Sequence, residues 1–107
     1  MKSGKDKSVV LINVFTVAAE NQRELVELLE RATLESIAHA PGFQGADLYR
    51  SLDGTKVTMH ARWRSAADHD AMRRSGGSER TLAAALAIAH FDPAMYELAR
   101  SFHGGPG

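Results

Sequence analysis

Apolar and polar positions along the chain predict four strands and two helical regions. Residues 9–17 are rich in β-branched and aromatic side chains, and neither the odd nor the even positions are polar, which predicts a strand with both faces buried. Across residues 20–39, apolar side chains recur every three or four positions, which predicts a helix that ends at Pro41-Gly42. A strand buried on both faces needs two covers. We expect helices on one side and a second sheet, supplied by a partner chain, on the other.

A tight hairpin is predicted next. Residues 43–52 and 56–64 read as strands on either side of Asp53-Gly54, a dipeptide that tolerates the positive φ angles of a short turn. Ser65 follows the second strand and is of the residue type that caps helix N-termini. A short helix is therefore expected over residues 66–74.

The remaining third of the chain contains a helix break and a final strand. Ser75-Gly76-Gly77-Ser78 interrupts the second helix, which resumes over residues 79–89. After Asp92-Pro93, apolar and polar residues alternate over residues 94–102, which predicts the last strand. The order β-α-β-β-α-β predicts a ferredoxin-like α+β fold, with both helical regions on one face of an antiparallel sheet. A length of 107 residues fits one domain, residues 1–107, with an ordered core of about 8–103.

Composition narrows the possible functions. The 13 basic and 13 acidic residues balance, which argues against nucleic acid or an anionic membrane as a partner. The chain has no cysteine, so disulfides, thiolate nucleophiles and cysteine-based metal sites are excluded. Its five histidines show no metal-ligand spacing, and we expect no metal. The apolar run near the N-terminus is too short to span a bilayer, so a cytoplasmic location is expected.

Several short motifs in order carry a resemblance to a known family. Pro41-Gly42-Phe43 begins the hairpin, Asp53-Gly54-Thr55 forms its tip, and Trp63-Arg64-Ser65 ends it. Together with the first strand at residues 13–17, this combination resembles the antibiotic biosynthesis monooxygenase family over roughly residues 9–102. The resemblance implies a dimeric α+β barrel, a homodimer in which two sheets pack face to face, with a substrate cleft in each subunit.

The resemblance also implies a chemistry: oxidation of an anthrone or quinol of an aromatic polyketide by O₂, without a cofactor. Such a reaction needs a base to remove a proton, donors to stabilise the enolate, and a dry aromatic pocket in which the anion reduces O₂. The substrate supplies the electrons, so the protein needs no redox group. The expected partners are therefore a small aromatic substrate and O₂.

Four residues are candidates for the catalytic set. Trp63 and Tyr49 match positions that line the polyketide cleft in the resembled enzymes, although Trp63 equally fits a core residue and Tyr49 an ordinary cross-strand aromatic. Asn13 lies on a buried strand, where its amide needs partners, either in the protein or on a ligand. His69 stands where some family members carry a tyrosine, and it can accept a proton near neutral pH. A surface or structural role is the competing reading of His69.

The expected substrate-binding residues are Phe15, which shares a face with Asn13, and Met59, Met72 and Arg80. Met59 stands where the resembled polyketide oxygenases often have an asparagine, so it reads as an apolar wall. Arg80 also fits a solvated helix arginine.

Two other functions stay open, and a third is disfavoured. A polyketide cyclase on the same fold needs the same enolate-stabilising pocket, and a non-catalytic dimer that binds an aromatic ligand needs only the cavity. Haem degradation, which the wider superfamily supports, pairs an asparagine on the first strand with a tryptophan and a histidine on the second helix. Asn13 fits that pattern, but Met72 and Leu82 occupy the matching helix positions and cannot replace those residues.

Overall fold

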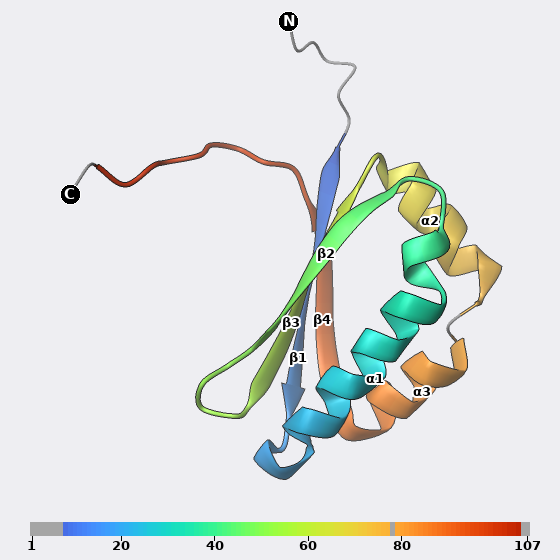
Figure 1. The fold of residues 1–107 in the computed structure, drawn as a ribbon, viewed down its shortest axis with the longest axis vertical. Coiled ribbons are helices and arrows are strands. Elements are labelled where there is room, and N and C mark those ends of the chain that lie inside the picture. The colour runs from blue at the N-terminus through green and yellow to red at the C-terminus, as the bar shows by residue number, and fades with distance from the viewer. Residues whose placement is uncertain (1–7, 78, 106–107) are drawn as a thin grey trace, which may run out of the picture.

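The computed structural model describes residues 8–77 and 79–105, which form one antiparallel sheet with helices packed on a single side (Figure 1). The strands are β1 (Val9–Val17), β2 (Phe43–Arg50), β3 (Lys56–Trp63) and β4 (Ala89–Tyr96). The helices are α1 (Gln22–Glu35), α2 (Ala66–Ser75) and α3 (Glu79–Ile88), with 3-10 turns at Ala19–Asn21 and Ile37–His39.

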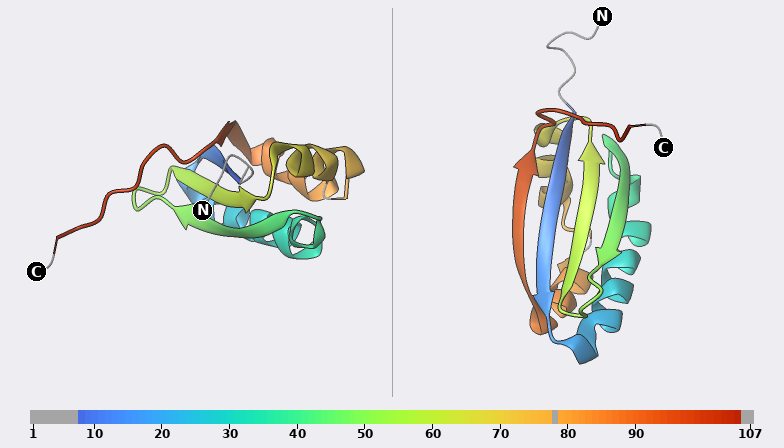
Figure 2. Two further views of the ribbon diagram at one scale, coloured as in Figure 1. Left: turned by 90° about the horizontal axis from the view of Figure 1, so that it is seen from above. Right: turned by 90° about the vertical axis from the view of Figure 1, so that its left-hand side faces the viewer.

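The sheet has the strand order β2-β3-β1-β4, and each neighbouring pair runs antiparallel (Figure 2, right). Both crossovers pass through the helical layer, so α1, α2 and α3 all cover the same face, here called the inner face (Figure 2, left). This arrangement confirms the predicted ferredoxin-like α+β fold.

The first helical region is shorter than the predicted helix over residues 20–39. The α-helix ends at Glu35, and Ser36 adopts a φ of −137°, which interrupts helical geometry before the turn at Ile37–His39. The face of α1 that meets the sheet carries the periodic apolar residues Leu25, Leu28, Leu29 and Ala32, all buried. The apolar period therefore identified the correct face of the helix but overestimated its length.

The predicted hairpin is present, and its tip is held by Asp53. The Oδ1 atom of Asp53 accepts hydrogen bonds from the Ser51 hydroxyl (2.7 Å) and from the Thr55 amide (3.0 Å) and hydroxyl (2.8 Å). These donors favour the ionised carboxylate and lower the pKa of Asp53 to about 2. Gly54 supplies the positive φ of 84° that the turn requires.

The predicted break in the second helical region is confirmed. Ser65 caps α2 by accepting a hydrogen bond from the Asp68 amide (3.1 Å), and Gly76 ends the helix in the left-handed conformation at a φ of 71°. Ser78, the last residue of the predicted break, lies outside the described residues.

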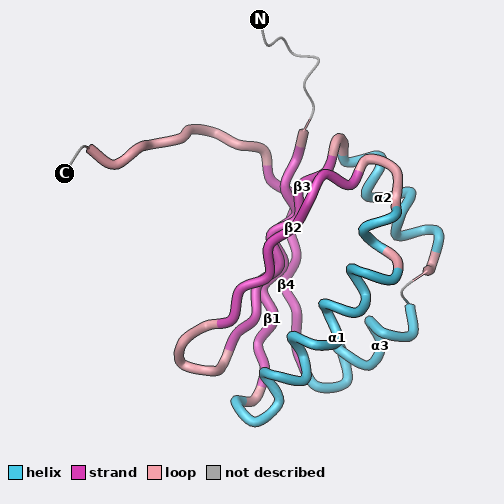
Figure 3. Tube along the Cα trace, in the orientation of Figure 1, coloured by secondary structure: helices cyan, strands magenta, loops and turns pink. Residues whose placement is uncertain are grey.

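The predicted last strand over residues 94–102 is wrong. The strand is β4, which begins at Ala89, and residues 97–105 have no regular secondary structure and run away from the sheet (Figure 3). Pro93 lies inside β4, opposite Asn13, and an edge strand tolerates proline because one side of its backbone needs no ladder partner. The alternation that predicted a strand ends in Leu98 and Phe102, which are 76% and 85% exposed.

The core lies between the inner face of the sheet and the helices. It consists of Phe15, Val17, Leu25, Leu28, Leu29, Ala32, Val57, Met59, Ala61, Trp63 and Ala85. The opposite face, here called the outer face, carries Val10, Ile12 and Val14 of β1, all only partly buried. No other element of the described chain covers it, so within one chain the expected two-sided burial of β1 holds for the inner face alone.

None of the helices found among residues 8–77 and 79–105 has both the length and the apolar character needed to cross a membrane.

Candidate active site

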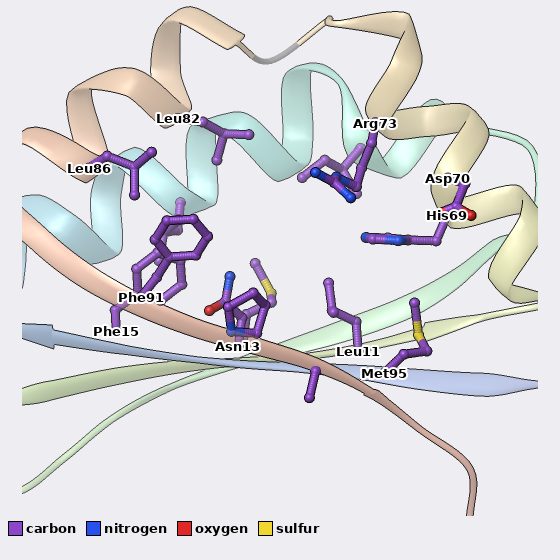
Figure 4. Close-up of a pocket in the computed structure, with 15 residues that line it drawn as sticks. Leu11, Asn13, Phe15, His69, Asp70, Arg73, Leu82, Leu86, Phe91 and Met95 are labelled. Carbon is purple, nitrogen blue, oxygen red and sulfur yellow. The ribbon is translucent and has the colours of Figure 1, made fainter.

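A cavity of about 410 Å³ lies between the inner face of the sheet and the helices, within the size range of small-molecule sites (Figure 4). Strands β1, β3 and β4 form one wall, and α1, the turn after it, α2 and α3 form the other. The lining residues are Leu11, Asn13, Phe15, Leu29, Ile37, Met59, His69, Asp70, Arg73, Leu82, Leu86, Phe91, Pro93, Ala94 and Met95.

Most of the cavity wall is apolar and one end of it is aromatic. Phe15 of β1 and Phe91 of β4 are paired across the sheet, and their rings stack with centroids 5.9 Å apart and planes 22° apart. Leu11 and Met59 continue the apolar wall along the neighbouring strand positions. This surface suits a flat, mostly apolar ligand.

Asn13 interrupts the apolar wall in the middle of β1. Its side chain faces the cavity between Leu11 and Phe15, and its cross-strand neighbours Met59 and Pro93 offer no side-chain hydrogen-bond donor. The Oδ1 atom of Asn13 is buried and has no hydrogen-bond partner among the described residues. A buried acceptor without a partner costs about 1–3 kcal/mol, so a ligand hydroxyl that reaches it gains a hydrogen bond no other group supplies.

His69 faces the same cavity from the first turns of α2. The start of α2 is fixed by Arg64, whose guanidinium binds both carboxylate oxygens of Asp68 at 2.7 and 2.9 Å, and by the Ser65 cap. Gly42 packs so closely against Asp68 that a side chain there would collide with the carboxylate. The helix start and the beginning of the hairpin are thereby held together, which sets the position of His69.

The imidazole of His69 is 8% exposed and packs edge-on against Trp63, with ring centroids 5.4 Å apart. Burial lowers the pKa of His69 below its ordinary value of 6.5; the charge of Arg73 lowers it further, and the charge of Asp70 opposes both. His69 is therefore neutral at pH 7 and can accept a proton from a molecule in the cavity.

Arg73 and Asp70 were not predicted as site residues. Both line the cavity from α2, and Arg73 lies one helical turn beyond His69, with its guanidinium extending over the sheet (Figure 4). The sequence signal for Arg73 is its four-residue spacing from His69, which places both side chains on one face of a helix.

Two of the predicted catalytic residues lie outside the cavity. Trp63 is on the inner face, 1% exposed, and packs between Phe43 (ring centroids 5.4 Å apart) and His69; its buried Nε1 has no hydrogen-bond partner among the described residues. Tyr49 pairs with Thr58 on the outer face and is 56% exposed. The strand register therefore points Tyr49 away from the cavity, and its placement in the cleft is corrected.

The predicted substrate-binding residues divide in the same way. Phe15 and Met59 line the cavity. Met72 instead packs against the core as a partly buried side chain, and Arg80 is exposed on α3, so neither is among the lining residues. Among residues 8–77 and 79–105, no group of three or more His, Cys, Asp and Glu side chains is placed to hold a metal ion.

The chain is similar in sequence to a known protein family and to one of its characterised members. The antibiotic biosynthesis monooxygenase family model matches residues 8–84. The chain is 50% identical over 62 residues to the tetracenomycin-F1 monooxygenase of Streptomyces glaucescens, covering 58% of this chain and 55% of that protein. The chain thus spans about half the length of this curated relative.

Solved structures share the fold across nearly the whole chain. SnoaB, a cofactor-independent oxygenase from Streptomyces nogalater, superposes with a TM-score of 0.81 at 20% identity, covering 89% of this chain and 96% of that one. The ActVA-Orf6 monooxygenase of Streptomyces coelicolor, in complex with Nanaomycin D, gives 0.76 at 22% identity and 96% coverage of both chains. A putative monooxygenase from Shewanella loihica gives 0.75 at 26% identity, covering 89% and 97%.

Fold and cavity define a ferredoxin-like α+β domain with a cavity of small-molecule size between its sheet and its helices. With the family model matched over residues 8–84, the chain belongs to the antibiotic biosynthesis monooxygenase family.

Proposed function

We propose that this protein is a cofactor-independent monooxygenase that oxidises an aromatic polyketide of the anthrone or phenol type to a quinone with O₂. The observation that carries the proposal is the pairing, in one apolar cavity, of a neutral buried His69 with the unpartnered Oδ1 of Asn13. One group can remove a proton and the other can hold a substrate hydroxyl, which are the tasks that such an oxidation sets.

His69 takes a proton from the acidic CH₂ carbon of the anthrone, and the resulting carbanion is delocalised into an enolate. The amide of Asn13 holds the oxygen substituents of the substrate at the cavity wall. The carbanion passes electrons to O₂ and a C–O bond forms, giving a hydroperoxide after protonation by the imidazolium. Loss of the second C–H proton and cleavage of the O–O bond then leave the quinone carbonyl and one water.

The activities of the related proteins support the proposed oxygenase function. The curated relative is a tetracenomycin-F1 monooxygenase, and two structural neighbours are a cofactor-independent oxygenase and a monooxygenase with Nanaomycin D bound. These activities belong to those proteins. They support a similar small aromatic substrate here because Asn13, His69 and the stacked phenylalanines supply what such a substrate requires.

The uncovered outer face supports a homodimer as the working form. Val10, Ile12 and Val14 form an apolar stripe along β1, and Tyr96 of β4 lies 49% exposed beside it. A second copy packed sheet to sheet would remove this surface from water and complete the α+β barrel.

The experiment is oxygen uptake by metal-stripped protein with emodinanthrone, without added flavin. We expect uptake well above the spontaneous rate, and a loss of about 10²- to 10⁴-fold in His69→Gln, the usual contribution of a general base. His103→Gln is the matched control, because His103 is exposed in the segment after β4 and is not among the lining residues. The rate of the wild type should fall on the acid side with a midpoint below pH 6.5, and this limb should vanish in His69→Gln.

Uptake equal to the spontaneous rate would refute the oxygenase. If emodinanthrone still binds in that case, measured by quenching of the single tryptophan, Trp63, the cavity belongs to a cyclase or a binding protein.

A further inference from the structure

Two of the residues that line the cavity are methionines, and the proposed chemistry gives their sulfur atoms no role. Met59 of β3 is 8% exposed and Met95 of β4 is partly buried, and both belong to the sheet wall of the cavity. A thioether sulfur is soft and polarisable, and peroxides oxidise it to a sulfoxide. The proposed reaction passes through a substrate hydroperoxide, so both sulfur atoms border the space in which that oxidant forms.

Strand pairing places the two methionines at different distances from His69. The inner-face residues of neighbouring strands form cross-strand rows, and successive rows lie two residues, or roughly 7 Å, apart along a strand. Trp63, on whose ring His69 packs, belongs to one row; Met95 belongs to the next row, and Met59 to the one after it, beside Asn13. Figure 4 likewise shows Met95 at the same end of the cavity as His69.

The sulfur of Met95 is the oxidisable group that the proposed hydroperoxide meets first. The reacting carbon of the substrate must lie beside His69, the base that takes its proton, and the oxygen that adds to this carbon then faces the sheet. The lining residues of the row beneath it are Leu11, which offers only hydrocarbon, and Met95. Trp63 also lies next to His69, but it is 1% exposed and is not among the lining residues.

We propose that Met95 is an oxidation site, which takes an oxygen atom from a hydroperoxide held in the cavity and thereby ends turnover. The inference rests on the proposed function, and it adds a modification that regulates the same site. The sulfur of Met95 attacks the terminal oxygen of the hydroperoxide R₂CH–O–OH, so that an S–O bond forms and the O–O bond breaks. The inner oxygen leaves with the bonding electron pair and takes the proton of the terminal hydroxyl. The products are the sulfoxide and the carbinol R₂CH–OH: the sulfur loses two electrons and the peroxide gains them.

This transfer competes with the productive step, in which the hydroperoxide loses its second C–H proton and becomes the quinone and water. Oxidation converts the flexible apolar side chain of Met95 into a polar one. The new S=O group lies beside Leu11, in a part of the wall that a flat aromatic substrate has to cover. Substrate binding then leaves this acceptor without a partner, so the affinity falls. Methionine sulfoxide reductases reverse the oxidation, so the loss of activity is reversible.

Turnover of emodinanthrone under ¹⁸O₂, followed by peptide mapping, tests the transfer. Catalase is present to remove released H₂O₂. We expect ¹⁸O in the sulfoxide of Met95 to increase with the number of turnovers, and to exceed that at Met72 about tenfold, because a bound hydroperoxide reacts as a neighbour. Met72 is the internal control, since it packs against the core outside the cavity lining. Equal labelling of Met95 and Met72, or unlabelled Met95 after the substrate is consumed, would overturn the inference.

Substitutions connect the oxidation to the loss of activity. Met95→Leu should complete several-fold more turnovers than the wild type before it loses half of its own initial rate, whereas Met72→Leu should be inactivated as the wild type is. Treatment of the inactivated wild type with reductases for both sulfoxide epimers should restore O₂ uptake. Inactivation that is as fast in Met95→Leu as in the wild type would show that the modification does not end turnover, and would overturn the inference.

A supplied hydroperoxide separates this inference from the proposed function. Cumene hydroperoxide, which is aromatic and apolar, should oxidise Met95 before Met72 without any turnover, and emodin bound in the cavity should protect Met95. This result in a protein that consumes no O₂ would keep Met95 as the oxidation site and remove the oxygenase. Uptake of O₂ with emodinanthrone, but no selective oxidation of Met95 by either route, would keep the oxygenase and overturn the inference.

Discussion

Replacing Asn13 by leucine should stabilise the protein. The Oδ1 atom of Asn13 is buried without a partner among the described residues, and its surroundings on β1 are Leu11 and Phe15. Leaving such an acceptor unpaired costs about 1–3 kcal/mol, and leucine has a similar size with no polar atom. The expected gain in the free energy of unfolding is about 1–2 kcal/mol, which for about 100 residues raises Tm by roughly 4–8 °C.

The same substitution should damage function. If Asn13 accepts a hydrogen bond from a substrate hydroxyl, its loss leaves the substrate misplaced relative to His69, and kcat should fall about 10²-fold. A substitution that raises stability and lowers activity is expected where a polar group is retained for function.

The assay pairs thermal unfolding, followed by circular dichroism at fixed protein concentration, with oxygen uptake at 25 °C. Fixed concentration matters because a dimer unfolds at a concentration-dependent temperature. Met59→Leu is the matched control: Met59 lines the same cavity opposite Asn13, and this swap should change stability by less than about 1.5 kcal/mol. A Tm that falls in Asn13→Leu would show that the amide is satisfied structurally, and the reasoning would be refuted.

Two further predictions concern His69 and the outer face. Because burial lowers the pKa of His69, the unfolded chain binds the proton more readily, so the stability that His69 contributes is complete above pH 6.5 and is lost as the pH falls below it. Between pH 7.5 and pH 5.5, the free energy of urea unfolding should therefore fall more in the wild type than in His69→Gln. An equal fall in the two proteins would contradict this prediction. Ile12→Glu places a carboxylate in the middle of the outer face and should convert a dimer into a monomer in sedimentation velocity, whereas Leu52→Glu at the exposed hairpin tip should not; an unchanged dimer in Ile12→Glu would place the interface elsewhere.

The parts of the fold that the sequence predicted correctly carry local signals. Asp53-Gly54 marks the hairpin because few other residues accept the φ of 84° found there. Ser65 and Gly76 mark the two ends of α2 because a hydroxyl satisfies the first free amides and glycine accepts the left-handed conformation. Each signal acts within a few residues, so no knowledge of the tertiary structure is needed to read it.

The errors arose where neighbours distant in sequence decide the outcome. The sequence pattern places the start of the last strand after Pro93, although Pro93 is tolerated inside β4, opposite Asn13, because β4 is an edge strand. A strand that begins after Pro93 does not include Phe91, which stacks on Phe15 at the aromatic end of the cavity. The resemblance places Tyr49 in the cleft, but its pairing with Thr58 puts it on the outer face. Strand order and register are set by the whole sheet, and a single segment does not contain them.

Polar residues at positions where the sequence pattern predicts burial indicate part of the cavity. Asn13 and His69 each occupy a face whose period predicts burial, and both line the cavity. Trp63 gives a weaker signal in the sequence, because a large aromatic residue on an apolar face fits the core equally well; in the structure it packs against Phe43 and His69. Arg73 carries no such signal, since an arginine late in a helix ordinarily faces solvent, and Arg73 is exposed while it also lines the cavity. Because a polar group on a buried face costs stability unless something pairs with it, Asn13 is the more informative signal, and a ligand hydroxyl is the partner that we propose for it.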